Sequence, residues 1–108
     1  MSKENRIVKL TLQAEEDLQE IYVYGRETWG KERVELFITV LYDRFQFLCD
    51  NPEIGRKREE FYSGCRSWVF EGYVIFYQLK DAYIEVIGVV HGSKDINRYF
   101  KGEGECGS

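Results

Sequence analysis

Residues 83–91, Tyr-Ile-Glu-Val-Ile-Gly-Val-Val-His, decide how this chain folds. The run is apolar at both alternating sets of positions, and only Glu85 and Gly88 interrupt it before His91. A strand with two apolar faces is typical of the middle of a sheet, because both faces need cover. His91 is the single histidine of the chain. We therefore expect a central strand, and its C-terminal end is the first place to look for function.

Two further strands are predicted just before this run. Residues 65–70 and 73–79 are rich in β-branched and aromatic side chains, and Glu71-Gly72 between them suits a tight turn. Lys80-Asp81 makes the next short connection. Three strands joined in this way predict an antiparallel meander.

The first half of the chain predicts a strand over residues 6–12 and then two helices. Thr11 suits the N-cap of the first helix, and Gly30 suits its end. The carboxylates expected in its first turn, where they favour the helix dipole, are Glu15, Glu16 and Asp17. The second helix begins at Lys31 or Glu32 and ends near Asp50, because Asn51-Pro52 does not continue a helix. Helices joined so closely fold into an antiparallel hairpin, which we expect to cover one face of the sheet.

Residues 53–63 predict a loop. Its basic run, Arg56-Lys57-Arg58, is followed by Glu59 and Glu60, which favours a solvated surface over a phosphate-binding patch. The expected fold is thus α+β, with an N-terminal strand, an antiparallel helix hairpin, a three-stranded antiparallel meander and a short C-terminal segment. We expect one domain over residues 1–101 and a flexible tail over residues 102–108.

Composition narrows the function. The 108 residues carry a net charge of −4, which argues against gripping nucleic acid by bulk electrostatics, and we expect no sequence-specific nucleic-acid binding. Three cysteines without close spacing and one histidine give no zinc pattern, so we expect no metal and no cofactor. The polar residues 1–9 lack a secretory signal, and no run reaches the roughly 20 apolar residues of a membrane helix. A cytoplasmic protein that does not contact membranes is expected.

An ordered set of motifs between residues 6 and 100 carries a resemblance. The motifs are Leu12-x-Ala14-x-x-Asp17-Leu18-x-x-Ile21-x-x-Tyr24, Leu48-x-x-Asn51-Pro52-x-x-Gly55, Arg66 before a strand, Tyr73-x-x-Phe76-Tyr77 and Val89-Val90-His91-Gly92-x-x-Asp95. In this order and spacing, the set resembles the ParE branch of the RelE/ParE superfamily of toxins from bacterial type II toxin–antitoxin systems.

The resemblance implies a helix hairpin on a twisted antiparallel sheet and a toxin held inactive by a ParD-like antitoxin. It also implies inhibition of DNA gyrase by direct protein–protein binding, without a catalytic act of its own. RelE-type relatives with the same fold cleave mRNA at the ribosome. A second alternative, from the residues alone, is a non-toxic adaptor that binds a protein partner.

The site residues follow from these readings. The predicted target-binding residues are Arg66, His91, Lys94, Asp95, Arg98, Tyr99 and Phe100. The predicted antitoxin-binding residues are Val40, Tyr42, Phe47, Trp68 and Tyr77. If the chain is a nuclease, Arg66, His91, Arg98 and Tyr99 are expected to converge at one end of the sheet.

Structural roles compete with these functional ones. His91 is expected either to contact the target or to be fixed by Asp95. Arg66 is expected either to contact the target or to pair with Asp95 or Glu85 and clamp the sheet. The acidic balance and the motif around His91 favour the inhibitor over the nuclease.

Overall fold

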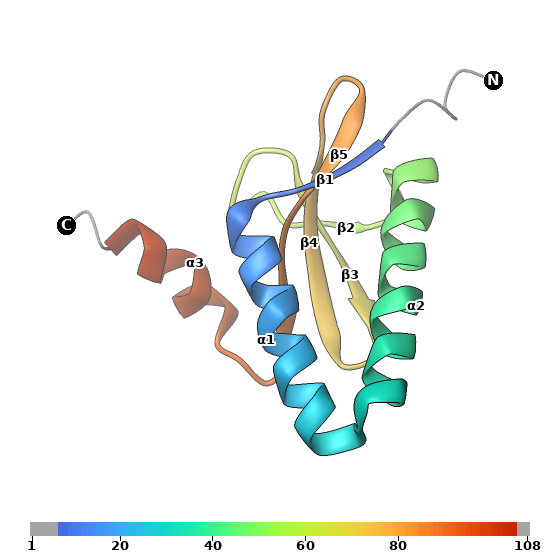
Figure 1. Cartoon of the computed structure of the whole chain (residues 1–108). Helices are drawn as coiled ribbons and strands as arrows, with labels where there is room; N and C mark the ends of the chain where they lie inside the picture. The colour runs from blue at the N-terminus through green and yellow to red at the C-terminus, as the bar shows by residue number, and fades with distance from the viewer. Residues whose placement is uncertain (1–6, 106–108) are drawn as a thin grey trace.

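The computed structural model describes the backbone of residues 7–105 and the side chains of residues 7–100. The elements, in order, are β1 (Ile7–Leu10), α1 (Leu12–Trp29), α2 (Lys31–Asp50), β2 (Arg56–Lys57), β3 (Cys65–Phe70), β4 (Tyr73–Leu79), β5 (Tyr83–His91) and α3 (Ile96–Glu105). Figure 1 shows α1 and α2 as a hairpin across the sheet, with α3 on the side of α1 away from α2. The α+β class and the helix hairpin predicted from the sequence are confirmed.

The sheet has five strands in the order β1-β5-β4-β3-β2. β5 lies between β1, which runs parallel to it, and β4, which runs antiparallel, so the prediction of an internal strand is confirmed. The meander β3-β4-β5 is also confirmed, and its first turn places Glu71 and Gly72 at positive φ of 46° and 86°. β2 corrects the loop predicted over residues 53–63, because Arg56 and Lys57 pair with Ser67 and Arg66.

The helix boundaries follow from local chemistry. The Thr11 hydroxyl accepts the N–H of Ala14 at 3.0 Å and caps α1. Gly30 joins the helices at φ 98°, a conformation that glycine adopts without steric cost. Gly25 lets the hairpin close, because a Cβ there would lie only 2.5 Å from Cγ2 of Val34.

Both faces of the sheet are covered. The larger core lies between the helix hairpin and the sheet, and includes Leu41, Phe45 and Ile84. On the other face, Cys65, Phe76, Ile87 and Val90 pack beneath Phe61 and the α3 residues Ile96, Tyr99 and Phe100.

The C-terminal segment differs from the expectation. α3 continues to Glu105, so the helix extends into the segment predicted as a tail from residue 102. Residues 106–108 of that predicted tail lie outside the described residues, as does Arg6, where the first strand was expected to begin.

The outer edge of β5 is completed by two different elements. β1 pairs with β5 only as far as Val86. Beyond that point α1 takes over, since the Thr11 hydroxyl donates to the Ile87 carbonyl at 2.9 Å and the Asp17 carboxylate accepts the Val89 N–H at 3.0 Å. Side chains of a helix therefore satisfy backbone groups that a strand would otherwise pair.

Candidate functional site

Asp17 joins α1, β5 and α3. Its carboxylate is 8% exposed, and besides the Val89 N–H it accepts the Tyr99 hydroxyl at 2.7 Å and the Gln13 amide at 3.0 Å. The dipole role predicted for Asp17 is wrong, because only Glu15 lies in the first turn of α1. Gly88 makes the arrangement possible, since a Cβ there would collide with the Tyr99 hydroxyl and lie 3.1 Å from the Asp17 carboxylate.

A hollow of about 410 Å³ opens beside this junction, between α1 and the end of β5. Its lining includes Glu20, Tyr24, Tyr73, His91, Lys94 and Tyr99. The structure therefore brings together three of the predicted target-binding residues, His91, Lys94 and Tyr99. Glu20 and Tyr24 from α1 were missing from that prediction. Tyr24 stood within the family motif, but the spacing alone gave it only a helical role.

His91 is exposed and is held by the turn that follows it. Its Nδ1 lies 2.7 Å from the Ser93 hydroxyl and accepts the Ser93 N–H at 3.1 Å, which leaves Nε2 available for a partner. The alternative in which Asp95 fixes His91 is wrong. The Asp95 carboxylate instead accepts the N–H of Arg98 at 3.2 Å and caps α3, because the turn directs residue 95 into the helix.

Arg66 lies at the other end of the sheet. It stands opposite Tyr77, whereas His91 stands opposite Tyr73 near the far ends of the strands. Its guanidinium donates to the backbone carbonyls of Glu53 and Gly55 at 3.1 and 2.8 Å. The predicted convergence of Arg66 with His91 is therefore wrong, and so is its pairing with Asp95 or Glu85.

The remaining C-terminal residues divide into two groups. Lys94 and Arg98 are exposed. Phe100 is half-buried and stacks on Phe61 at 4.5 Å between ring centres, with Phe76 edge-on at 5.0 Å. Phe100 and Tyr99 thus anchor α3, a role that the sequence did not predict.

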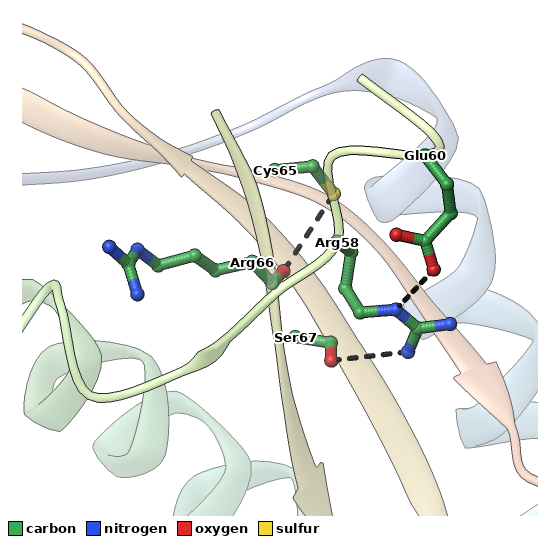
Figure 2. Close-up of polar contacts among 5 residues, drawn as sticks. All are labelled: Arg58, Glu60, Cys65, Arg66 and Ser67. Carbon is green, nitrogen blue, oxygen red and sulfur yellow. Dashed lines mark hydrogen bonds and ion pairs between the residues drawn. The ribbon is translucent and has the colours of Figure 1, made fainter. Parts of the chain in front are cut away.

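The basic run of residues 56–58 also divides. Arg56 and Lys57 are exposed, as predicted, but Arg58 is half-buried, with its Nε 3.0 Å from Glu60 and its Nη1 3.4 Å from the Ser67 hydroxyl. Figure 2 shows the Arg66 guanidinium directed away from this cluster. Hydrogen bonds from its own backbone and from Arg58 lower the pKa of Glu60. Burial raises the pKa of the nearby Cys65 thiol to about 11, although Arg58 acts in the opposite direction.

Most of the predicted partner-binding residues lie where α2 meets β3. Val40, Phe47 and Trp68 are half-buried there, and the rings of Phe47 and Trp68 lie 5.8 Å apart. Tyr42 is 47% exposed on α2. Tyr77 is wrong as a contact residue, because it is completely buried and its hydroxyl donates to the Pro52 carbonyl at 2.9 Å and accepts the Gly55 N–H at 3.0 Å. The stability of the fold therefore depends on Tyr77, and its side chain offers no surface to a partner.

A second hollow, of about 490 Å³, leads from the end of β5 towards α2. It reaches Phe37, Val40 and Phe70, and it shares Tyr24, Tyr73 and His91 with the first hollow. The two hollows therefore adjoin at these three residues. Over the described residues, no group of three His, Cys, Asp or Glu side chains is placed to hold a metal ion. None of the described helices is both long and apolar enough to span a membrane.

Comparisons with known proteins agree with the fold. A family model described as the ParE toxin of type II toxin-antitoxin systems, parDE, matches residues 8–96. The chain is 27% identical over 85 residues to Toxin ParE1 of Caulobacter vibrioides, covering 79% of this chain and 88% of that protein. It is 28% identical over 86 residues to Toxin ParE1 of Mycobacterium tuberculosis strain H37Rv, with the same coverage of 79% and 88%.

A solved structure of the chromosomal ParDE toxin–antitoxin system from P. aeruginosa superposes with a TM-score of 0.69 at 21% sequence identity. The match covers 81% of this chain and 96% of that one. At this level of identity, the likeness concerns the fold.

Proposed function

The chain belongs to the family of ParE toxins from type II toxin–antitoxin systems, and from this premise we propose that it inhibits DNA gyrase by direct binding and is neutralised by a ParD-like antitoxin. It acts in the cytoplasm as an inhibitor of an enzyme and is not itself an enzyme.

One observation supports a non-enzymatic function: the candidate nuclease residues do not lie together. A ribonuclease needs a base, an acid and a cation within reach of one phosphate. Arg66 lies at the opposite end of the sheet from His91, and its guanidinium is engaged by backbone carbonyls. The Tyr99 hydroxyl is engaged by Asp17. This arrangement supports a surface for binding over a site for catalysis.

The hollow at the end of β5 supports a protein target. His91 and Lys94 stand on its rim beside Tyr24 and Tyr73, and Arg98 is exposed on the adjoining helix. The Tyr24 ring is exposed there, and tyrosine and arginine are among the residue types that dominate binding energy at protein interfaces. We propose this depression as the gyrase-binding surface, with Lys94 and Arg98 as its charged contacts.

The surface between α2 and β3 suits the antitoxin. Val40, Phe47 and Trp68 form an apolar seam there, and Tyr42 adds an exposed ring on the same helix. An amphipathic helix laid into such a seam buries its apolar face.

The test of the target uses two reactions with the same purified protein. We expect inhibition of gyrase supercoiling and no cleavage of mRNA on ribosomes. Addition of the purified product of the small gene beside the toxin gene should restore supercoiling. Ribosome-dependent cleavage with normal supercoiling would instead assign the RelE-like activity. Normal supercoiling, intact mRNA and normal growth on induction would assign the adaptor role.

A further inference from the structure

One charged residue interrupts the apolar seam on α2. Arg44 stands one turn after Val40 and one turn before Phe47, so all three lie on the same side of the helix. The centre of its guanidinium lies 5.4 Å from the ring centre of Phe47 and 5.6 Å from that of Phe70 on β3. These rings hold the cation between the helix and the sheet.

One hydrogen-bond donor of the Arg44 side chain is buried without an acceptor among the described residues. Its Nε is buried and has no hydrogen-bond acceptor within the described part of the chain. A buried donor left unpaired destabilises the protein that contains it, by about 1–3 kcal/mol and by more for a charged group. Nε itself is closed to a partner, but Arg44 as a whole is only half-buried, and the terminal nitrogens of a guanidinium that two rings already orient are suited to receive a carboxylate in a two-pronged contact.

The surroundings leave room for a segment that carries this carboxylate. Val40 and Phe47 flank Arg44 along α2 and, like Trp68, pack at the margin of the main core, and the second hollow is lined by Val40 and Phe70. β2 pairs with β3 only at Arg66 and Ser67, so the described sheet has no strand beside the edge that runs from Trp68 to Phe70. The backbone edge of β3 beside the seam is therefore left unpaired by any described strand from Trp68 to Phe70.

We propose that Arg44 is the charged anchor for the antitoxin. An Asp or Glu of the antitoxin, flanked by apolar side chains that cover Val40, Phe47 and Trp68, forms a salt bridge with the terminal nitrogens of the guanidinium. Charge complementarity selects this occupant, because an uncharged apolar segment would bury the cation further without pairing it. The inference rests on the proposed neutralisation by an antitoxin and adds the residue that selects the partner.

The substitution Arg44→Met tests the anchor. Methionine keeps an unbranched apolar chain against Phe47 and Phe70 but has no donor. Arg26→Met, at an exposed arginine of α1, is the matched control. Calorimetric titration with the purified product of the adjacent gene should show a dissociation constant raised on the order of 100-fold for Arg44→Met and by less than about 3-fold for Arg26→Met.

Thermal unfolding of the free toxin separates binding from packing. Because the unpaired donor is removed, the midpoint for Arg44→Met should equal or exceed that of the wild type. Each Asp and Glu of the antitoxin is then changed to Asn or Gln and titrated against both toxins. One position should weaken binding to the wild type and have no further effect on Arg44→Met.

The outcomes are distinguishable. If Arg44→Met binds the antitoxin with wild-type affinity, Arg44 is not the anchor, but the proposal of an antitoxin partner still holds. A weaker complex in which no acidic position couples to Arg44 also overturns it, because Arg44 then acts only by packing. No complex between the wild-type toxin and the adjacent product would remove the antitoxin proposal itself.

Discussion

The single carboxylate of Asp17 links three elements of this protein. It accepts hydrogen bonds from Val89 on β5 and Tyr99 on α3 while it is buried against both. Asp17→Ala leaves the Val89 N–H unpaired and releases α3. We expect the free energy of unfolding in urea to fall by about 2–4 kcal/mol. The exposed neighbour Glu16, changed to Ala, should alter it by less than about 0.5 kcal/mol. Equal effects of the two substitutions would contradict the bridging role of Asp17.

Single residues were also the hardest to interpret from the sequence. Tyr77 was predicted at a surface because strand alternation gives two faces but not which of them is covered, and here both are. His91 was paired with Asp95 because the two are close in sequence, but Ser93 is closer in space. Asp17 was assigned a local role, since nothing near it in the sequence indicates a contact with residue 89 or 99. Arg44 gave no signal, because one cation in an apolar stripe reads as a solvated side chain.

Cys65 makes a prediction about pH. Burial raises the pKa of its thiol in the folded protein from 9.0 to about 11. Above pH 9 the unfolded chain loses this proton and the folded chain keeps it, so stability is full below pH 9 and falls as the pH rises to 11. Urea unfolding across this range should show a steeper fall for the wild type than for Cys65→Ala. Burial also raises the pKa values of Tyr73 and Tyr77 in both proteins. The Cys65 thiolate adds to the rise at Tyr77, so this coupling is part of the difference between the wild type and Cys65→Ala. Parallel curves would show that the Cys65 thiol does not titrate differently on unfolding.

At the scale of elements, α3 depends on its aromatic contacts. Phe100 stacks on Phe61 and covers Phe76, so its removal uncovers the second core. We expect Phe100→Ala to lower the free energy of unfolding by about 2–3 kcal/mol. The Cys65 thiol beneath it should also react faster with a thiol reagent in native buffer. Asn97→Ala, on the exposed side of α3, is the control and should change neither quantity. An unchanged thiol reaction rate in Phe100→Ala would show that α3 does not shield this face.

Elements were predicted well where apolar periodicity or end signals were strong. The bounds of α1, α2, β3, β4 and β5 agree with the sequence because Thr11, Gly30 and Asn51-Pro52 mark helix ends and Glu71-Gly72 marks a turn. β2 was missed because two basic residues carry no alternation. The parallel pairing of β1 with β5 was not predicted, since it joins the two ends of the chain and depends on the packing of the helices between them.

At the scale of the whole molecule, the two proposed surfaces approach each other. The hollow at the end of β5 and the hollow that leads to α2 share Tyr24, Tyr73 and His91. An antitoxin held at the α2 seam therefore reaches the edge of the proposed gyrase surface. Competition for the shared residues would be enough for neutralisation, without any change in the shape of the toxin.

The charges nevertheless allow the two functions to be separated. Lys94 and Arg98 are exposed near the first hollow, whereas Arg44 lies at the seam. The double substitution Lys94→Glu and Arg98→Glu should reduce inhibition of supercoiling by at least about 10-fold and leave antitoxin affinity within about 3-fold of the wild type. Arg56→Glu together with Lys57→Glu, at exposed positions of β2 beside Arg66 and so at the opposite end of the sheet from His91, provides a control of equal charge. Equal loss of inhibition in both variants would indicate a nonspecific effect of net charge.

The pairing of β5 with β1 and α1 has a consequence for folding during protein synthesis. β1 finds its partner strand, and α1 its edge contacts, only in residues 83–89, so the N-terminal third of the chain cannot complete these contacts until those residues are translated. Contacts of such long sequence separation form late and slowly, because most of the chain must be ordered at once. A growing chain on the ribosome therefore has neither its complete sheet nor its β5–α3 surface until β5 and α3 have been synthesised.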